Sequence, residues 1–158
     1  MKQQTIEVNQ IQGLAKTLQL MNYLEQLSLN NQSFVSFVKS QFDLPCQSCI
    51  PGKVWAYIRQ NFLYKDDDPY DEILTAPYLM NEIRQGDCDD FSLYAKTILD
   101  ILGFHTNYVL LGKDKNEYTH IVVLCYGSDH RSGPIIVDGA NPIFNKINNQ
   151  YKYSKIIK

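Results

Sequence analysis

A cysteine, a histidine and an aspartate follow one another in an order that could form a thiol–imidazole–carboxylate site. Cys88 lies in the string Gly-Asp-Cys-Asp-Asp-Phe, and His120 and Asp138 follow on two later apolar segments. A thiol becomes a nucleophile when a base takes its proton, and the base works best when a third group orients it. We therefore predict Cys88 as the nucleophile, His120 as the base and Asp138 as the orienting carboxylate.

The surroundings of Cys88 predict that it lies in the first turn of a helix. Asp87 is a natural N-cap, and a buried stripe follows at Phe91, Tyr94, Ala95, Ile98, Leu99 and Leu102. Unpaired N–H groups at a helix start stabilise a thiolate and can hold an oxyanion. Asp89 and Asp90 oppose this because like charge disfavours the thiolate, so a protonated histidine would be needed nearby. The alternative is a Cys88 that is only a small buried hydrophobe.

His120 is the preferred base among three histidines. Strand alternation places it on the face opposite Cys125, which is therefore expected in the core. His105 comes after the far end of the Cys88 helix, roughly 20 Å from its start, and His130 lies in a polar turn. Asp138 precedes Gly139, so its alternative role is that of a turn residue.

Cys46 and Cys49 form an isolated C-x-x-C motif with open interpretations. A redox motif of this kind is expected in a thioredoxin-like βαβ unit, which the sequence lacks, and a zinc site would need two further ligands. Because the chain shows no signal peptide and no apolar run that could span a membrane, we expect a cytoplasmic or virion-associated protein. All four cysteines are then expected to be reduced.

Length and composition fit one folded domain without a charged binding surface. The chain has 158 residues, 44% of them hydrophobic and 20% charged, and a net charge of −2. This balance favours neither a nucleic-acid binder nor a membrane-surface protein. The charge is uneven, with acidic residues between 66 and 72 and a basic stretch after residue 140, which we expect to be a solvated loop and a frayed tail.

The order of the predicted elements is helices first and strands afterwards. Apolar spacing predicts a helix over 6–29, a second, shorter helix that begins after Ser33 as a possible N-cap, and a third helix over 54–62. A turn-rich break at 45–52 separates the second helix from the third. Residues 104–111, 117–126 and 134–138 are predicted to be strands. This order indicates an α+β domain in which the helix carrying the nucleophile packs on an antiparallel sheet.

Together these motifs resemble the transglutaminase-like superfamily of the papain-like fold, in its small bacterial or phage form. The resemblance rests on Gly86–Phe91 opening a helix, Thr119–Val122 on a strand and Ile136–Gly139 on the next strand. It extends upstream over 55–64 and 72–77. It implies a catalytic core over 50–140, with a helical N-terminal extension over 1–50 and a basic tail over 141–158.

The resemblance implies a cysteine-dependent enzyme that attacks a protein or peptide amide through a thioester. No metal or organic cofactor is required for this chemistry. Tyr64 and Trp55 are the preferred side-chain donors for an oxyanion, with Tyr78 and Gln85 as further candidates. Two other functions stay open: a catalytically silent adaptor or phage structural protein, which would dock a partner through residues 1–50 or the basic tail, and a cell-wall amidase.

Overall fold

A computed structural model describes residues 4–5, 8–66, 74–127 and 133–158, with side chains from Leu14 onward. Its helices are α1 (Val8–Leu29), α2 (Gln32–Phe42), α3 (Ile50–Asn61), α4 (Pro77–Ile83) and α5 (Cys88–Ile101), with a short 3-10 helix, η1 (Gln47–Cys49), before α3. The acidic positions 67, 68, 71 and 72, and His130, lie outside the described residues.

An antiparallel sheet of four strands follows the helices. Its strands are β4 (His105–Gly112), β6 (His120–Tyr126), β7 (Ile135–Val137) and β8 (Tyr153–Ile157), in the spatial order β7-β6-β4-β8. Two short pairs lie outside it: β1 (Gln4–Thr5) with β5 (Glu117–Tyr118), and β2 (Leu63–Tyr64) with β3 (Gln85–Gly86). The predicted α+β architecture is confirmed.

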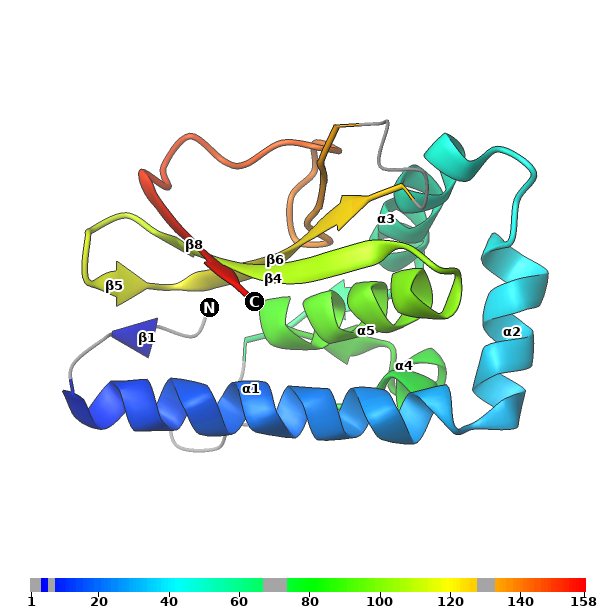
Figure 1. The fold of residues 1–158 in the computed structure, drawn as a ribbon, viewed down its shortest axis with the longest axis horizontal. Coiled ribbons are helices and arrows are strands. Elements are labelled where there is room, and N and C mark those ends of the chain that lie inside the picture. Colours follow the sequence, from blue (N-terminus) through cyan, green and yellow to red (C-terminus); the bar gives the residue numbers. More distant parts are fainter. Residues whose placement is uncertain (1–3, 6–7, 67–73, 128–132) are drawn as a thin grey trace.

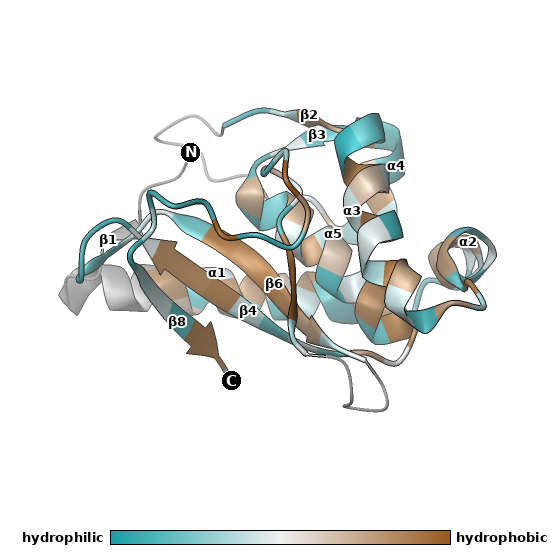
Figure 2. Cartoon of the chain, turned by 90° about the horizontal axis from the view of Figure 1, so that it is seen from above, coloured by the Kyte–Doolittle hydropathy of each residue, from teal (hydrophilic) through white to brown (hydrophobic). Residues whose placement is uncertain are grey.

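The sheet has a core on each face. Figure 1 shows α5 lying between the sheet and the long helix α1. The α5 side of β6 carries Ile121, Val123 and Cys125, as strand alternation requires. The opposite side carries Val122 and Leu124, and the chain between β7 and β8 covers it. Figure 2 shows how strongly hydrophobic residues are concentrated in β4 and β6.

Several element boundaries differ from the prediction because local capping decided them. The N-cap of α2 is Asn31, not Ser33, and its side chain accepts a hydrogen bond from the N–H of Phe34 at 3.0 Å. Helix α3 begins at Ile50 rather than 54, because Pro51 is tolerated in a first turn. Residue Ala76 is extended, as expected before a proline, but Pro77 then starts helix α4, which the sequence analysis did not predict.

The C-terminal segment is ordered structure rather than a frayed tail. Residues 153–157 form β8, which pairs antiparallel with β4. The tail prediction is wrong for these residues because Ile156 and Ile157, set among lysines, were too few to give a strand signal. Within the described part of the chain, no helix has the length and apolar character needed to cross a bilayer.

Candidate active site

Cys88 is the first residue of α5, and a double cap fixes that end of the helix. The Asp87 side chain accepts from the N–H groups of Asp89 and Asp90, and Oδ2 of Asp90 accepts from the Asp87 N–H at 3.1 Å. This is a capping box, which satisfies helix donors in both directions. The predicted N-cap is confirmed.

Asp90 also ties the preceding loop to the helix. Its Oδ1 accepts a hydrogen bond of 2.8 Å from the N–H of Thr75, just before α4. A Cβ added at Gly86 would lie 2.6 Å from the Cβ of Asp90, so only glycine permits this close approach. The Gly-Asp-Cys-Asp-Asp string therefore encodes a compact and buried helix start.

The sulfur of Cys88 has a carboxylate beside it. Its Sγ donates to Oδ1 of Asp89 over 3.7 Å, and both residues are 2% exposed. The two neighbouring aspartates thus have different roles: Asp90 serves the cap, whereas Asp89 faces the thiol. A carboxylate in this place favours the protonated thiol, so forming a thiolate requires a counter-charge.

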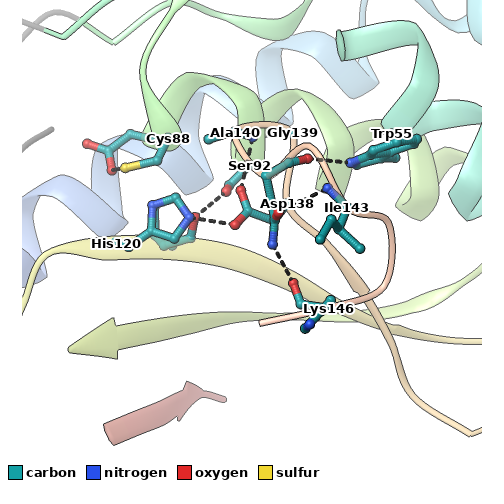
Figure 3. Close-up of polar contacts among 12 residues, drawn as sticks. Trp55, Cys88, Ser92, His120, Asp138, Gly139, Ala140, Ile143 and Lys146 are labelled. Carbon is teal, nitrogen blue, oxygen red and sulfur yellow. Dashed lines mark hydrogen bonds and ion pairs between the residues drawn. The ribbon is translucent and has the colours of Figure 1, made fainter. Parts of the chain in front are cut away.

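His120 and Asp138 form a buried pair. Nε2 of His120 lies 2.7 Å from Oδ2 of Asp138, and their side chains are 4% and 7% exposed. In Figure 3 the other ring nitrogen lies on the side of Cys88. This nitrogen, Nδ1, is buried and has no hydrogen-bond partner within the described ranges. A ring held through one nitrogen with the second one open can exchange a proton with a group beside it.

The turn after β7 holds Asp138 in place. Its Oδ1 accepts from the N–H of Ala140 at 3.0 Å, and an added Cβ at Gly139 would lie 2.6 Å from Cγ2 of Ile58. The indole N–H of Trp55 donates to the carbonyl of Asn141 at 3.0 Å, as Figure 3 shows. Helix α3 is therefore the platform that positions the carboxylate.

The two preferred oxyanion donors differ in placement. Strand β2 pairs with β3 so that Tyr64 lies opposite Gly86, two residues before Cys88. Burial is the main cause that raises the pKa of Tyr64, and ionised Cys88, Asp66 and Asp87 add to it, so its hydroxyl stays protonated and able to donate. That hydroxyl has a side-chain hydrogen bond with Asp66, and the Trp55 N–H is engaged with the carbonyl of Asn141.

Tyr151 is a site residue that the sequence analysis missed. Its ring stacks on the imidazole of His120 with centroids 5.3 Å apart and planes 9° apart. Burial and the charges of Asp138 and Cys88 raise its pKa to about 12, consistent with a position beside both groups. No sequence signal pointed to it, because it lies in the segment expected to fray.

A cavity of about 230 Å³ opens next to His120 and Asp138. Its lining consists of Tyr64, His120, Asp138, Ala140, Asn141, Pro142, Asn148, Gln150 and Tyr151. Most of this wall comes from the segment after β7. Apart from the His120–Asp138 pair it carries no ionisable side chain other than tyrosine, so the space beside the imidazole is polar but largely uncharged.

The other cysteines and His105 lie elsewhere. Cys125 is fully buried in the core, as predicted, and burial raises its pKa to about 12. His105 is exposed at the start of β4. Cys46 and Cys49 form a disulfide, so the expectation that all four cysteines are reduced is wrong for this pair, which the short helix η1 brings together.

Solved structures share this fold at low sequence identity. Calcium-bound LapG from Legionella pneumophila matches with a TM-score of 0.55 over 85% of this chain and 83% of LapG, at 21% identity. A candidate cysteine protease from Cytophaga hutchinsonii matches at 0.52 over 68% of this chain and 36% of its own, at 16% identity. A candidate protease from Parabacteroides distasonis matches at 0.57 over 77% and 26%, at 11% identity.

These similarities show the fold, which is the papain-like, transglutaminase-like one that the motifs predicted. The chain spans about a third of the length of the Cytophaga protein and most of LapG. No protein-family model matches the chain, and no curated protein matches it in sequence.

Proposed function

We propose that this chain is a cysteine peptidase-type enzyme that cleaves a protein or peptide amide through a thioester on Cys88. One observation carries the proposal: a buried His120–Asp138 pair, joined over 2.7 Å, turns its open ring nitrogen toward a cysteine at a helix N-terminus. A purely structural core has no need for a cysteine, a histidine and an aspartate in this arrangement. The shared fold with candidate cysteine proteases supports the same function.

The proposed reaction begins with proton transfer from Cys88 Sγ to Nδ1 of His120. The thiolate attacks the carbonyl carbon, and the C=O electron pair moves onto the oxygen. The Cys88 backbone N–H and the Tyr64 hydroxyl are the proposed donors to this oxyanion. The intermediate collapses when His120 gives its proton to the leaving amine, which leaves a thioester that water then hydrolyses with His120 as base.

Each supporting group has a physical task in this scheme. The carboxylate of Asp138 holds the imidazole by Nε2 and stabilises its charged form. That positive charge offsets the carboxylate of Asp89, which otherwise keeps the thiol protonated. An oxyanion donor typically contributes about 10²- to 10³-fold to the rate, and this sets the expected effect of removing the Tyr64 hydroxyl.

One of the LapG structures that share this fold is calcium-bound. The described residues contain no group of three or more His, Cys, Asp or Glu side chains arranged to hold a metal ion. Both carboxylate oxygens of Asp90 already accept backbone N–H groups. The residues that the structure describes therefore do not fit a cation site, and the proposed mechanism has no step through one.

The experiment is covalent labelling by a peptide-based acylating probe directed at thiols. We expect labelling of the folded chain, its loss in Cys88→Ala, and its retention in Cys125→Ala, a matched change at the buried core cysteine. Labelling that persists in Cys88→Ala on a sulfur other than the exposed Cys46 and Cys49 would overturn the proposal. A folded wild-type chain that no probe labels would favour the silent adaptor.

Substrate panels then separate the remaining chemistries. Release of a free carboxyl from peptides supports hydrolysis, which we favour, whereas incorporation of an added amine indicates cross-linking. Cleavage of muropeptides without cleavage of protein-derived peptides would favour the cell-wall amidase.

A further inference from the structure

The disulfide between Cys46 and Cys49 lies on the surface at the start of α3, apart from the groups used in the proposed reaction. We propose that this pair is a redox-active dithiol that exchanges with thiol reductants such as glutathione or a protein dithiol. The inference does not depend on the peptidase proposal, since it concerns different sulfur atoms and a different reaction.

The Cys46–Cys49 bond contributes little to the stability of the fold. It closes a loop with a sequence separation of 3, and the stabilisation from a cross-link grows with the length of loop it closes. The Cys49 N–H already donates to the Cys46 carbonyl at 3.1 Å, which closes the same loop without the sulfurs. No residue of η1 is buried, so the cross-linked residues themselves lie outside the core, which the chain enters again at Ile50.

The disulfide is accessible to thiols in solution. Both Cys46 and Cys49 are exposed, so a thiolate from solution can approach the disulfide. Cys88 and Cys125 are buried, and burial raises the pKa of Cys125 to about 12, which leaves very little thiolate there. The exposed pair is therefore where thiols and oxidants in solution meet this chain first.

The sulfur of Cys49 is a favourable leaving group when the disulfide is attacked. Cys49 is the N-cap of α3, a helix of 12 residues, and no side chain caps that end. The N–H of Ile50 already bonds to the carbonyl of Gln47 and Pro51 has none, so the remaining N–H groups of the first turn, together with the helix dipole, stabilise a thiolate at this position. Thiols in C-x-x-C motifs at helix starts have lowered pKa values for this reason, and a lower pKa makes a faster leaving group.

Two thiols of the reductant are needed to reduce the Cys46–Cys49 disulfide. The thiolate of the reductant attacks Sγ of Cys46, the S–S bond breaks, and its electron pair goes to Sγ of Cys49. A second thiol then attacks the reductant sulfur of the mixed disulfide, which forms the oxidised reductant and releases the Cys46 thiolate. The two thiols of the reductant supply the two protons, so one disulfide is reduced as another is formed.

The test is a redox titration of the full chain. The protein is equilibrated in buffers of reduced and oxidised glutathione, quenched in acid, alkylated and digested with trypsin. The peptide over 40–53, between two lysine sites, carries both cysteines and neither of the others. We expect reversible interconversion, with half reduction inside the range of glutathione ratios that separates the endoplasmic reticulum from the cytosol.

Two results of the titration would overturn the proposal. A pair that stays oxidised at every ratio in the folded chain, yet is reduced once the chain is denatured, is a structural staple, because such disulfides resist the glutathione pool. A pair that stays reduced in fully oxidised glutathione does not form the bond in solution.

Single variants test the direction of attack. Cys49→Ser should accumulate a glutathione adduct on Cys46, because the resolving sulfur is gone. Cys46→Ser leaves Cys49, whose lowered pKa gives it more thiolate at neutral pH, so its adduct should form faster than that of Cys46 in Cys49→Ser; equal rates would contradict the assigned roles. The double variant should melt within about 2 °C of the wild type, whereas a loss of about 10 °C would again indicate a staple.

Discussion

The hydroxyl of Ser92 donates a hydrogen bond of 2.9 Å to the carbonyl oxygen of Ile121. Ser92 lies one helical turn after Cys88, and Ile121 directly follows His120. This single buried bond therefore ties the start of α5 to the start of β6.

Ser92→Ala should misplace Cys88 relative to His120 without unfolding the protein. A buried hydrogen bond contributes about 1 kcal/mol, so we expect a small drop in stability and a roughly tenfold slower reaction of Cys88 with the acylating probe. Thr97→Ala is the matched control, because its hydroxyl bonds to Leu93 within the same helix at 2.7 Å. Equal labelling rates in the two variants would contradict the positioning role.

The stacking of Tyr151 on His120 should matter through its ring and not through its hydroxyl. Tyr151→Phe keeps the stack and should react with the probe at close to the wild-type rate. Tyr151→Leu removes the stack. We expect labelling of Cys88 to slow by about two- to tenfold, which is the rate change that corresponds to the interaction energy of one aromatic pair. Equal rates in the leucine and phenylalanine variants would show that the stack has no influence.

The cap of α5 should affect reactivity as well as stability. Asp87→Ala and Asn31→Ala each remove an N-cap side chain, at a typical cost of about 0.5–2 kcal/mol. Only Asp87 adjoins Cys88, so only its variant should also slow labelling. Thermal melting measures the first effect and probe kinetics the second; slower labelling in Asn31→Ala would indicate a general loss of folding instead.

A second buried charge cluster joins α1 to α5 away from the site. Lys96 Nζ lies 2.7 Å from Asp100 and 3.3 Å from Glu25, which is 3% exposed. Burial, then Asp100, raises the pKa of Glu25 from 4.5 to about 8, while the two carboxylates outweigh burial and raise the pKa of Lys96. Lys96 interacts with two carboxylates, whereas Glu25 interacts with one lysine that lies closer to Asp100.

Stability should accordingly fall as the pH rises. A carboxyl whose pKa is raised by folding binds its proton more tightly in the folded state, so its contribution is full below pH 4.5 and is lost as the pH rises through about 8. We expect the melting temperature to fall over this window in the wild type and to change less in Glu25→Gln. The exposed Glu82→Gln is the control and should follow the wild type; a Glu25→Gln curve parallel to both would contradict this origin.

The sequence predicted those parts of the fold that local patterns encode. Capping chemistry and apolar spacing located the helix that starts at Cys88, and alternation placed Cys125 in the core. The order of residues also predicted the pairing of His120 with Asp138, which the geometry brings into contact. These features depend on neighbours within a few residues of one another or on a motif of distinctive order.

The features that the sequence did not reveal depend on contacts between distant segments. Tyr151 reaches His120 only because β8 returns the chain to the sheet, and Trp55 meets Asn141 across 86 positions. Tertiary pairing of this kind leaves no periodic trace in a single sequence. The Cys46–Cys49 bond is different, because it joins cysteines only three positions apart, and the prediction was wrong because it inferred the redox state from the expected compartment.

The most direct test of the central claim is the pH dependence of Cys88 alkylation by a small haloacetamide in wild type and in His120→Ala. If the imidazole activates the thiol, wild-type Cys88 reacts rapidly at pH 6, where an ordinary thiol is almost entirely protonated, and His120→Ala abolishes this reaction. Cys125, read in the same digest, should stay unmodified in both folded proteins. Identical pH profiles for Cys88 in the two proteins would contradict a catalytic thiol–imidazole pair.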